Sequence, residues 1–440
     1  MSTLEILPDE ILLEICRYLH CGDVLYAFFG LNSRLNQTIT FYRQHVSLHR
    51  TFYMKFLHIF TVILPQIGYS ICSLVIFELE SSLFFQSFKH DNSYPNLEKL
   101  TLVNWTDEKL ILFVDTLHGM KNFRKLIIQA LDLTDSMKNI NLLRKLLSTN
   151  DNQLNELIFD HECDAFSITD ENDECSINYP NIKQLDIELR TTTDLFKLIE
   201  IVPNLEKLHI TFKNSWTKIP PEHQQFSHLK NFSVYAMSWF STFDDLKTLV
   251  QISSSIENLS FVLVTHDYSM IDKKSIYSIL PETVKQFHYS ICYQPSDANE
   301  QFDPKKIIRT WKPISIDYSI CENDRRIFLH TVLYQSTRLS LRSLFNKNMS
   351  TLLNSLTYRN VRHLHVYDTI NLIETFGIIQ HCRRILDLII SVRTLPTSKI
   401  IYQQKNLLIF FCRKSRTSKK NDLPSSSQSI RFSINSRHIT

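Results

Sequence analysis

Tyr94-Pro95-Asn96-Leu97-Glu98-Lys99-Leu100-Thr101-Leu102 is the segment that decides the fold of this chain, because the sequence repeats it. It returns as YPNIKQLDI at residues 179–187 and as VPNLEKLHI at residues 202–210. Looser copies keep its apolar-x-x-apolar-x-apolar spacing, and successive copies begin roughly 23 to 31 residues apart. A repeat of this length is typical of stacked units, none of which buries its apolar face alone. The looser copies begin at Ile71, Phe123, Leu154, Leu229, Ile256, Val284, Trp311, Val361 and Ile385, and a degraded copy that begins at Ser336 keeps the apolar Leu339 and Leu341.

Each copy predicts a strand, and the sequence between copies predicts helices. Proline in the lead-in keeps the preceding residue out of the helical conformation, so a helix stops just before the strand begins. Between the copies, apolar residues recur at intervals of three and four, which is the helical period. Stacked strand–helix units share one core under a curved parallel sheet, so the predicted fold class is an α/β solenoid. The predicted helices span residues 107–117, 195–201, 244–252, 327–333, 349–356 and 370–379.

The first residues follow a different pattern, that of a few short helices. Residues 7–19 (LPDEILLEICRYL) place Pro8 where the first turn of a helix tolerates a missing N–H. Gly22 ends this helix, and Asp23 is expected to cap a second one. Helices this short carry more apolar surface than they can hide among themselves, so the segment needs a partner. Their apolar side chains recur at helical spacing, at Ile11, Leu12, Ile15 and Leu19 and then at Val24, Leu25, Phe28 and Leu31.

These residues resemble the F-box, the helical module with which substrate receptors bind the adaptor of cullin-type ubiquitin ligases. The resemblance covers about residues 4–45 and implies a small all-α module. The family often carries Trp at the position of Leu35, where this chain keeps an apolar residue without the large ring. An N-terminal helical hairpin that caps the rest of the chain is the alternative. The resemblance assigns the adaptor contact, or the helices beneath it, to Leu7, Pro8, Ile11, Leu12, Ile15, Leu19, Val24, Leu25 and Leu35.

The repeats resemble the irregular leucine-rich repeats that often follow an F-box. The resemblance covers about residues 71–410, and the alternative is a compact α/β domain with coincidental strand spacing. Regular members carry a ladder of Asn at their turns. Here Trp105, Arg190 and Lys213 hold those positions, so the turns must satisfy their backbone groups by other means.

The same patterns predict four segments. They are an F-box module at 1–48, a linking helix at about 52–64 within 49–70, the leucine-rich-repeat-like solenoid at 71–412, and a basic, Ser-rich disordered tail at 413–440. Within the solenoid, the acidic stretch 161–176 is expected to be a solvated loop.

Composition points to a soluble intracellular protein. The 48 basic and 45 acidic side chains nearly cancel, so no general attraction to nucleic acid or membrane follows. Nine cysteines without a Cys-x-x-Cys pair predict buried thiols in a reducing compartment. The apolar stretch 52–77 is broken by Lys55, His58 and Pro65 well short of the ~18 to 20 residues that a membrane span needs. We expect a cytoplasmic protein, with the basic run at 413–420 as an alternative nuclear address.

Alternation along each predicted strand leaves rows of side chains that point away from the core. We expect these rows to be the recognition surface, although a charged sheet face is often merely solvated. The middle units offer an acidic pocket suited to a partner bearing Lys or Arg, and later units are more neutral and aromatic. The candidate substrate-binding residues are Glu156, Asp160, Asp186, Glu188, His209, Tyr235, His288, His365 and Tyr367.

No pattern predicts catalysis, a metal or a cofactor. The five glycines are too scattered for a phosphate-binding loop or a nucleophile elbow. His363 and His365, like His161 and Cys163, lack further ligands at a spacing typical of metal sites. The predicted protein is a non-enzymatic substrate receptor whose F-box binds a Skp-family adaptor and whose repeats hold a protein substrate. The alternative is a free-standing repeat scaffold with an N-terminal helical cap.

Overall fold

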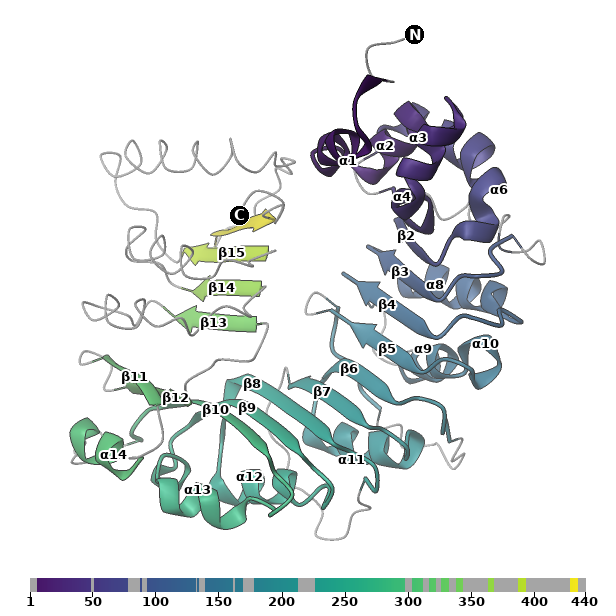
Figure 1. Cartoon of the computed structure of the whole chain (residues 1–440). Coiled ribbons are helices and arrows are strands. Elements are labelled where there is room, and N and C mark those ends of the chain that lie inside the picture. Colours follow the sequence, from purple (N-terminus) through teal and green to yellow (C-terminus); the bar gives the residue numbers. More distant parts are fainter. Residues whose placement is uncertain are drawn as a thin grey trace. The chain divides into compact units, whose positions relative to one another are not determined.

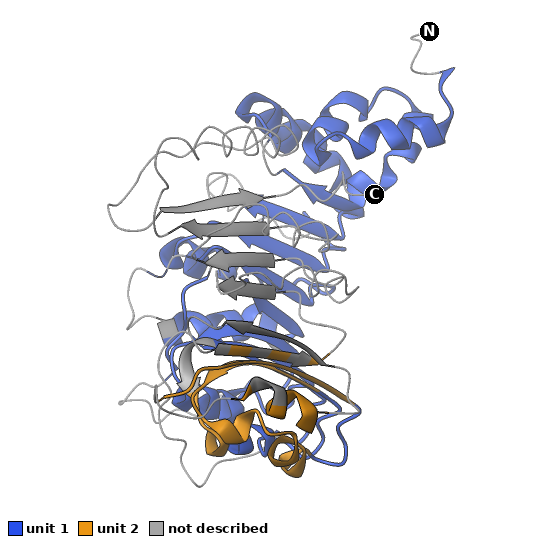
Figure 2. Ribbon diagram, turned by 90° about the vertical axis from the view of Figure 1, so that its left-hand side faces the viewer, with its two compact units in different colours: residues 1–239, 247–258, 281–285 blue, residues 240–246, 259–280, 286–440 orange. Residues whose placement is uncertain are grey.

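The structure is a computed structural model, and it describes residues 6–48, 51–77, 88, 93–131, 133, 139–160, 163–168, 178–212, 226–296, 303–311, 316–321, 326–331, 338–342, 363–367, 387–392 and 428–433. The chain divides into two compact units (Figure 2). Unit 1 comprises residues 1–239, 247–258 and 281–285, and unit 2 comprises residues 240–246, 259–280 and 286–440. The helices predicted at 349–356 and 370–379, and most of the acidic stretch 161–176, lie outside the described residues.

Unit 1 begins with a group of short helices, which Figure 1 draws in purple. Helix α1 (Asp9–Arg17) starts directly after Pro8, as the sequence predicts. Helix α2 starts at Cys21, so the expected capping role of Asp23 is wrong. Asp23 lies in the first turn, and its carboxylate binds the ammonium of Lys55 at 2.6 Å. The elements that follow α1 are α2 (Cys21–Phe28), α3 (Ser33–Thr38), α4 (Thr40–Gln44) and strand β1 (His45–Ser47).

A linking helix without a break runs from the N-terminal helices to the first repeat. It consists of α5 (Tyr53–His58), a π-helical turn (Ile59–Ile63) and α6 (Leu64–Ile67), and a 3-10 turn (Gly68–Ser70) follows. Pro65 gives a reason for the wide turn, because it has no N–H to donate to the carbonyl of Thr61. The helix continues through Pro65 and ends at Ile67, three residues later than the predicted 52–64.

The parallel strands of unit 1 follow one another in space as they do in the chain. Each of the strands β1 to β7 pairs with the next one along the sequence. The strands β2, β4, β5 and β8 begin two residues after the predicted starts of their copies, and β3, β6 and β7 begin five residues after theirs, directly behind the Pro-Asn lead-in and its first apolar and polar residues. The result is an open α/β sheet. Its strands are β2 (Ser73–Phe77), β3 (Lys99–Val103), β4 (Lys125–Gln129), β5 (Glu156–Phe159), β6 (Gln184–Leu189), β7 (Lys207–Phe212) and β8 (Asn231–Ser241).

Helices cover one face of this sheet, as Figure 1 shows. They are α8 (Asp107–Val114) with a 3-10 turn (Asp115–Leu117), α9 (Asn139–Leu147), α10 (Thr149–Asn152) and α11 (Thr192–Ile201), so the helices predicted at 107–117 and 195–201 are present. The core lies between the two layers, where strand residues such as Leu126 and Ile128 are fully buried. Thr191 and Asp194 form a capping box at the start of α11. Asp194 also accepts the N–H of Ile168 at 2.6 Å, which ties segment 163–168 to that helix.

A repeated backbone contact joins the entrances of the strands in unit 1. One carbonyl of each unit of the repeat accepts the N–H groups of two consecutive residues of the next; Glu98, for example, accepts from Arg124 and Lys125 at 3.0 Å each. A carbonyl oxygen has two lone pairs, so both bonds can form together. Each strand entrance is thereby fixed by the preceding one. The accepting carbonyls belong to Cys72, Glu98, Arg124, Asn155, Lys183, Glu206 and Lys230.

Side chains complete the contacts that an Asn ladder would make. The indole N–H of Trp105 donates to the carbonyl of Ile76 at 3.4 Å, and Nε of Arg190 donates to the carbonyl of Ala165 at 3.2 Å. Lys213 lies outside the described residues. The Asn that stands one residue before the first apolar position of a copy, preceded by Pro in two of the three cases, makes a second series at the other end of the strands. Its members are Asn96 to Tyr69 O at 2.7 Å, Asn122 to Pro95 O at 3.0 Å and Asn204 to Pro180 O at 3.1 Å.

Antiparallel strands in unit 2 depart from the predicted parallel sheet. Strand β12 (Arg326–Thr331) pairs in antiparallel fashion with β10 (Gln286–Tyr293) and with β11 (Ile316–Cys321). The helix predicted at 327–333 is therefore wrong, and Ile327, Leu329 and Thr331 are buried at the two-residue interval of a strand. Only residues 322–325 separate β11 from β12. Such a connection suffices for a hairpin but not for a parallel crossover.

The last strands form a separate sheet of unit 2 in the order β13, β14, β15, β16. Strand β16 pairs antiparallel to β15 and lies inside the segment 413–440 that the sequence predicts to be disordered, so that prediction is wrong there. Its sequence QSIRFS alternates polar and apolar residues, which is the signature of a strand. The strands are β13 (Arg338–Arg342), β14 (His363–Tyr367), β15 (Asp387–Val392) and β16 (Gln428–Ser433).

The remaining elements are α12 (Phe243–Val250), which matches the helix predicted at 244–252, strand β9 (Asn258–Thr265), a 3-10 turn (Tyr268–Met270), α13 (Lys273–Ile279) and α14 (Pro304–Thr310). A buried aromatic pair packs the end of α14 against β10 in unit 2, with the rings of Tyr289 and Trp311 stacked 6.0 Å apart. Burial raises the pKa of Tyr289, whose hydroxyl donates to the carbonyl of Met270 at 2.8 Å. Within the described part of the chain, no helix has both the length and the apolar character needed to cross a membrane.

Candidate functional site

Helix α1 carries two apolar stripes, and only one of them is buried. Leu12 and Cys16, one turn apart, are each 1% exposed, and α1 packs against α3. Ile11, Ile15 and Tyr18 recur at intervals of four and three on the neighbouring stripe and are 49%, 36% and 64% exposed. The first stripe accounts for the folding of the helical group, and the second remains at its surface.

Polar contacts fix the start of α1 in this position. The guanidinium of Arg34 in α3 donates to the carboxylate of Asp9 at 2.9 Å and to the carbonyl of Leu7 at 2.5 Å. Burial raises the pKa of the Cys16 thiol, which suits a packing role on the covered stripe. The exposed stripe is thus presented by a helix that is anchored at its N-terminal end.

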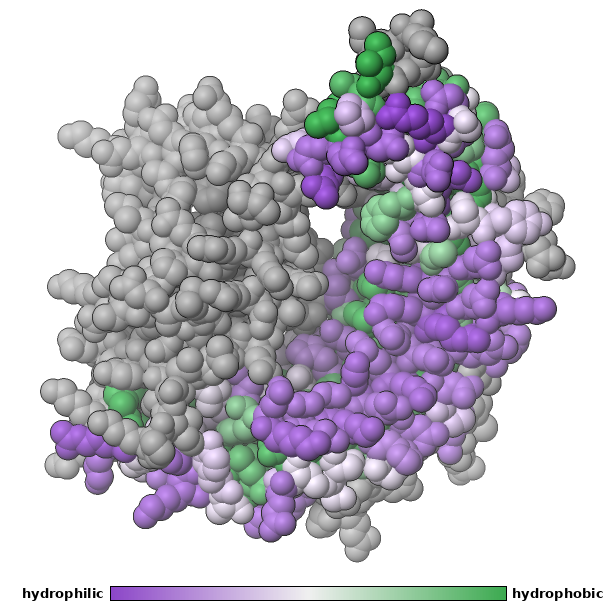
Figure 3. Space-filling view, viewed as in Figure 1, coloured by the Kyte–Doolittle hydropathy of each residue, from purple (hydrophilic) through white to green (hydrophobic). Residues whose placement is uncertain are grey.

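Exposed apolar side chains are concentrated in the N-terminal part of unit 1. Of the sixteen large apolar residues that are exposed in the described part of the chain, thirteen lie between Ile6 and Tyr69. Figure 3 shows hydrophobic residues, in green, at the surface of the N-terminal helices. Monomeric proteins rarely leave so much apolar surface together unless it binds something.

The structure separates the residues that the sequence predicts for adaptor contact. Leu12, Val24, Leu25 and Leu35 are buried, and Leu7 and Leu19 are half-buried. Pro8, Ile11 and Ile15 are exposed. Sequence reasoning missed Tyr18, although its distance of seven positions from Ile11 and three from Ile15 is the signal that places it on the same stripe.

The other face of the helical group fastens it to the sheet. The thiol of Cys21 in α2 accepts the N–H of Ser47 in β1 at 3.4 Å and lies 3.7 Å from the carbonyl of His45. Lys55 of α5 binds Asp23 of α2. These contacts make α2 the bridge from the helical group to the first strand and to the linking helix.

The second candidate surface is the face of the unit 1 sheet opposite the helices. Its residues alternate with the core residues along each strand and are mostly half-buried, as the alternation predicts. Thr101, at 6% exposure, is the buried exception on this row. In strict register, the central row runs through Val75, Thr101, Ile127, Ile158, Asp186, His209 and Ser233.

The predicted acidic pocket is partly committed to local contacts. Glu156 forms an ion pair with Lys125 on the neighbouring strand. Asp160 accepts the N–H of Ala130, which has a φ of +53°, at 3.0 Å. Asp186 lies beside His209 in the register of β6 and β7. Burial lowers the pKa of Lys99, and the nearby Lys125 lowers it further. The face therefore carries basic groups on β3 and β4 and carboxylates on β5 and β6.

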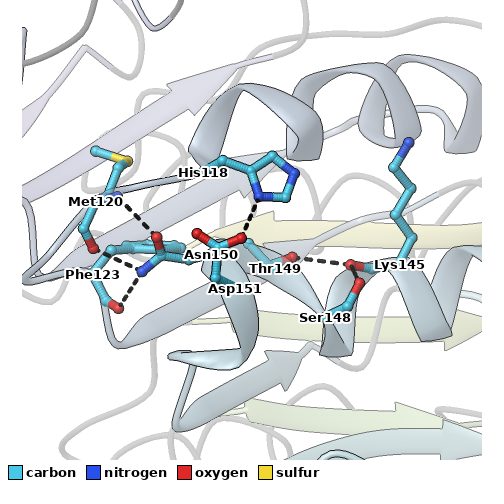
Figure 4. A network of polar contacts seen from close by, with 8 residues as sticks. All are labelled: His118, Met120, Phe123, Lys145, Ser148, Thr149, Asn150 and Asp151. Atoms are coloured by element: carbon cyan, nitrogen blue, oxygen red, sulfur yellow. Dashed lines mark hydrogen bonds and ion pairs between the residues drawn. The ribbon is translucent and has the colours of Figure 1, made fainter. Parts of the chain in front are cut away.

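A polar network sets the position of the two strands at the centre of this face. Asn150, fully buried and with a φ of +58°, accepts the N–H of Met120 at 2.9 Å and donates to the carbonyls of Met120 at 2.7 Å and Phe123 at 3.2 Å (Figure 4). Segment α10, which precedes β5 and has a left-handed backbone at Asn150 and Asp151, is thereby tied to the loop before β4. Next to it, Asp151 contacts the ring of His118 at 3.2 Å.

Six of the nine predicted substrate-binding residues lie together on β5 to β8 or directly after β5: Glu156, Asp160, Asp186, Glu188, His209 and Tyr235. His288 belongs to unit 2 and is buried, 4% exposed, with Nδ1 3.1 Å from the hydroxyl of Ser260, so its predicted exposure is wrong. His365 and Tyr367 lie on β14 of unit 2, and their side chains are outside the described part.

No cluster of three or more His, Cys, Asp or Glu in the described residues could hold a metal ion. Cys163 is buried, and its thiol contacts Asp160 and the carbonyl of Ile128 at 3.4 Å each. Burial is the main cause of the raised pKa of this thiol. Compared with known proteins, the chain matches no family model, and no curated protein is similar to it in sequence.

Proposed function

We propose that this chain is a non-catalytic substrate receptor of a cullin-RING ubiquitin ligase. In this proposal the N-terminal helices are an F-box that binds a Skp-family adaptor, and the strand–helix units are a leucine-rich-repeat-like solenoid that holds a protein substrate. The observation that carries the proposal is the exposed stripe of Ile11, Ile15 and Tyr18 on a helix whose other stripe is already covered. Covering apolar surface stabilises a complex by roughly 25 cal/mol per Å² before the costs of association.

The proposed mechanism is proximity. A receptor that holds substrate and adaptor at a fixed separation raises the effective concentration of a substrate lysine near the ubiquitin-loaded enzyme. The linking helix from Tyr53 to Ile67 has no break, and α2 contacts both β1 and α5. These contacts suit a rigid connection between the helical group and the first repeats.

The second candidate function is a free-standing repeat scaffold outside any ligase. It is favoured by the same contacts of α2 with β1, because they make the helices an integral start of the sheet. The scaffold reading leaves the exposed stripe of α1 without a purpose.

The test is co-purification with a Skp-family adaptor. Wild type is compared with Ile11→Asp/Ile15→Asp, and Leu13→Asp serves as a matched control because Leu13 is also exposed, at 37%, on another side of α1. We expect a one-to-one complex for wild type and the control, and its loss in the double variant. Circular dichroism is used to check that each protein is folded. A folded wild type that binds no adaptor, or a double variant that still binds, contradicts the proposal.

A further inference from the structure

The open sheet face of unit 1 changes character between β5 and β6. From β2 to β5 its central row is formed by Val75, Thr101, Ile127 and Ile158, none of which carries a charge. Phe77 and its register partner Val103 widen this floor on one side. The side chains of this floor other than Thr101 are half-buried, so they remain within reach of a partner.

Charged residues lie on two sides of this apolar floor. On the margin where the strands begin, Lys99 and Lys125 are register partners, and Lys125 forms an ion pair with Glu156 of β5. Asp186 follows Ile158 directly in the register of β5 and β6, and Glu188 lies two residues further along β6. A ligand that crosses the strands therefore meets apolar side chains first and carboxylates next.

We propose that this face binds an extended protein segment in which alternating apolar residues are followed by Lys or Arg. The inference rests on the proposed function, since it names the class of substrate that the repeats would hold. The floor is two residues wide along β2 and β3, about 7 Å, and one residue wide on β4 and β5, where Gln129 and Asp160 take the second position. This width fits an extended chain better than a helix of ~10 to 12 Å diameter. The carboxylates of β6 select the positive charge.

Strand spacing sets the length of the segment. Neighbouring strands lie about 4.8 Å apart, so β2 to β5 spans roughly 14 Å, or about four to five residues of extended chain. Strand β6 lies one spacing further, which is one to two residues. The expected ligand has apolar side chains at alternate positions, about three in all, and a basic residue roughly two positions after the last of them.

A display library of random twelve-residue peptides tests this surface directly. The library is selected on wild type and on Ile127→Lys/Ile158→Lys, with Leu112→Lys as control because Leu112 is 63% exposed on α8 of the helical face. We expect wild type and the control to enrich the described pattern. A synthesised peptide from that pool should bind Ile127→Lys/Ile158→Lys at least tenfold more weakly than wild type. The same loss is expected for a second variant, Asp186→Lys/Glu188→Lys.

Three results overturn the inference: no enrichment on wild type, enriched peptides without a basic residue, or peptides that bind the variants as tightly as wild type. Co-purification with the adaptor is measured on the same variants. Since Ile11 and Ile15 are unchanged in them, loss of peptide with retained adaptor supports the inference. A chain that binds peptides but never the adaptor contradicts the proposed function and leaves the peptide surface established.

Discussion

The N-terminal helices and the strand–helix units of unit 1 differ in how fully their large apolar side chains are buried. In the strands, residues such as Leu100, Leu126 and Leu185 are fully buried, and exposed large apolar residues are rare among the described units. Between Ile6 and Tyr69 the same kinds of side chain reach the surface repeatedly. The core-facing apolar residues of the strands are explained by folding, whereas the apolar content of the helices exceeds what their folding uses.

Because of this difference, substitutions of buried strand residues should report on stability, and substitutions of exposed helix residues should report on binding. Removing a strand residue should lower the free energy of unfolding, because the side chain already has its partners. Removing an exposed residue of α1 should leave that free energy unchanged and alter only association.

The largest effect is expected in the strands. Leu126→Ala removes a fully buried side chain from β4 and should lower the free energy of unfolding by about 2 to 5 kcal/mol. Urea unfolding followed by circular dichroism measures it. A loss below about 1 kcal/mol would mean that the side chain of Leu126 contributes little to folding, and the contrast would fail.

Asn150→Ala should destabilise unit 1 by about 2 to 3 kcal/mol, since it removes three buried hydrogen bonds and places alanine at a φ of +58°. Asn150→Gly loses the same bonds but tolerates this φ, so it should be less damaging. Thermal unfolding of the two variants separates the contributions. Equal melting temperatures would show that the backbone conformation adds nothing.

The junction between the two regions should be intolerant of a methyl group. A Cβ on Gly68 would lie 2.3 Å from the carbonyl oxygen of Ser93, which is backbone and cannot rotate away. Gly68→Ala should therefore cost about 1 to 3 kcal/mol in unfolding free energy. An unchanged melting temperature would show that the linking helix is free to shift against the first repeat.

Substitutions of exposed apolar residues in the helices should be nearly silent in stability. Tyr18→Ser and Phe52→Ser, at positions 64% and 77% exposed, should change the free energy of unfolding by less than about 0.5 kcal/mol. Their retention on a hydrophobic interaction column should fall. A large loss of stability in either variant would erase the distinction between the two regions.

The smallest effect concerns the ion pairs at the strand entrances. A hydrogen bond from Lys183 lowers the pKa of Glu206, and one from Lys285 lowers that of Glu257. A lowered folded-state pKa adds stability above the unfolded-state pKa, and this stability is lost as the pH falls through the folded-state pKa. Because both carboxylates are solvated, Glu206→Gln/Glu257→Gln should shift the urea midpoint slightly at pH 7 and not at pH 3 or in 1 M salt. A shift that persists at pH 3 contradicts an ionic origin.

The sequence predicted the repeats well because their pattern is local. Strands β2 to β8 start where the repeat places them, and the alternation identified which side chains of β4 to β7 leave the core. The hairpin of β11 and β12 was missed because the apolar residues at 327–333 fit both periods: Leu329 and Leu333 are four apart, as in a helix, and Ile327 and Leu329 are two apart, as in a strand. The sequence also could not predict that Leu12 is buried and Ile11 exposed. The two residues lie on neighbouring stripes of α1, and the packing of α3, a tertiary contact, decides which stripe is covered.

The local roles of the candidate acids were also beyond the sequence. Asp160 holds the N–H of Ala130, a residue whose positive φ follows from the turn after β4. Glu156 is engaged by Lys125 thirty-one positions earlier in the chain. The sequence places these carboxylates on the open face, but only the position of the neighbouring strand shows that they already have local partners.

The bond from Ser47 to the thiol of Cys21 bears on the outer edge of the sheet. Strand β1 is the outermost strand of its sheet, and a bare outer strand invites edge-to-edge aggregation. The N–H of Ser47 is bonded to the sulfur of Cys21 in α2, so it cannot pair with a strand from another chain. Cys21→Ala would release this N–H at the edge of the sheet, so we expect its consequence to include self-association as well as a loss of stability.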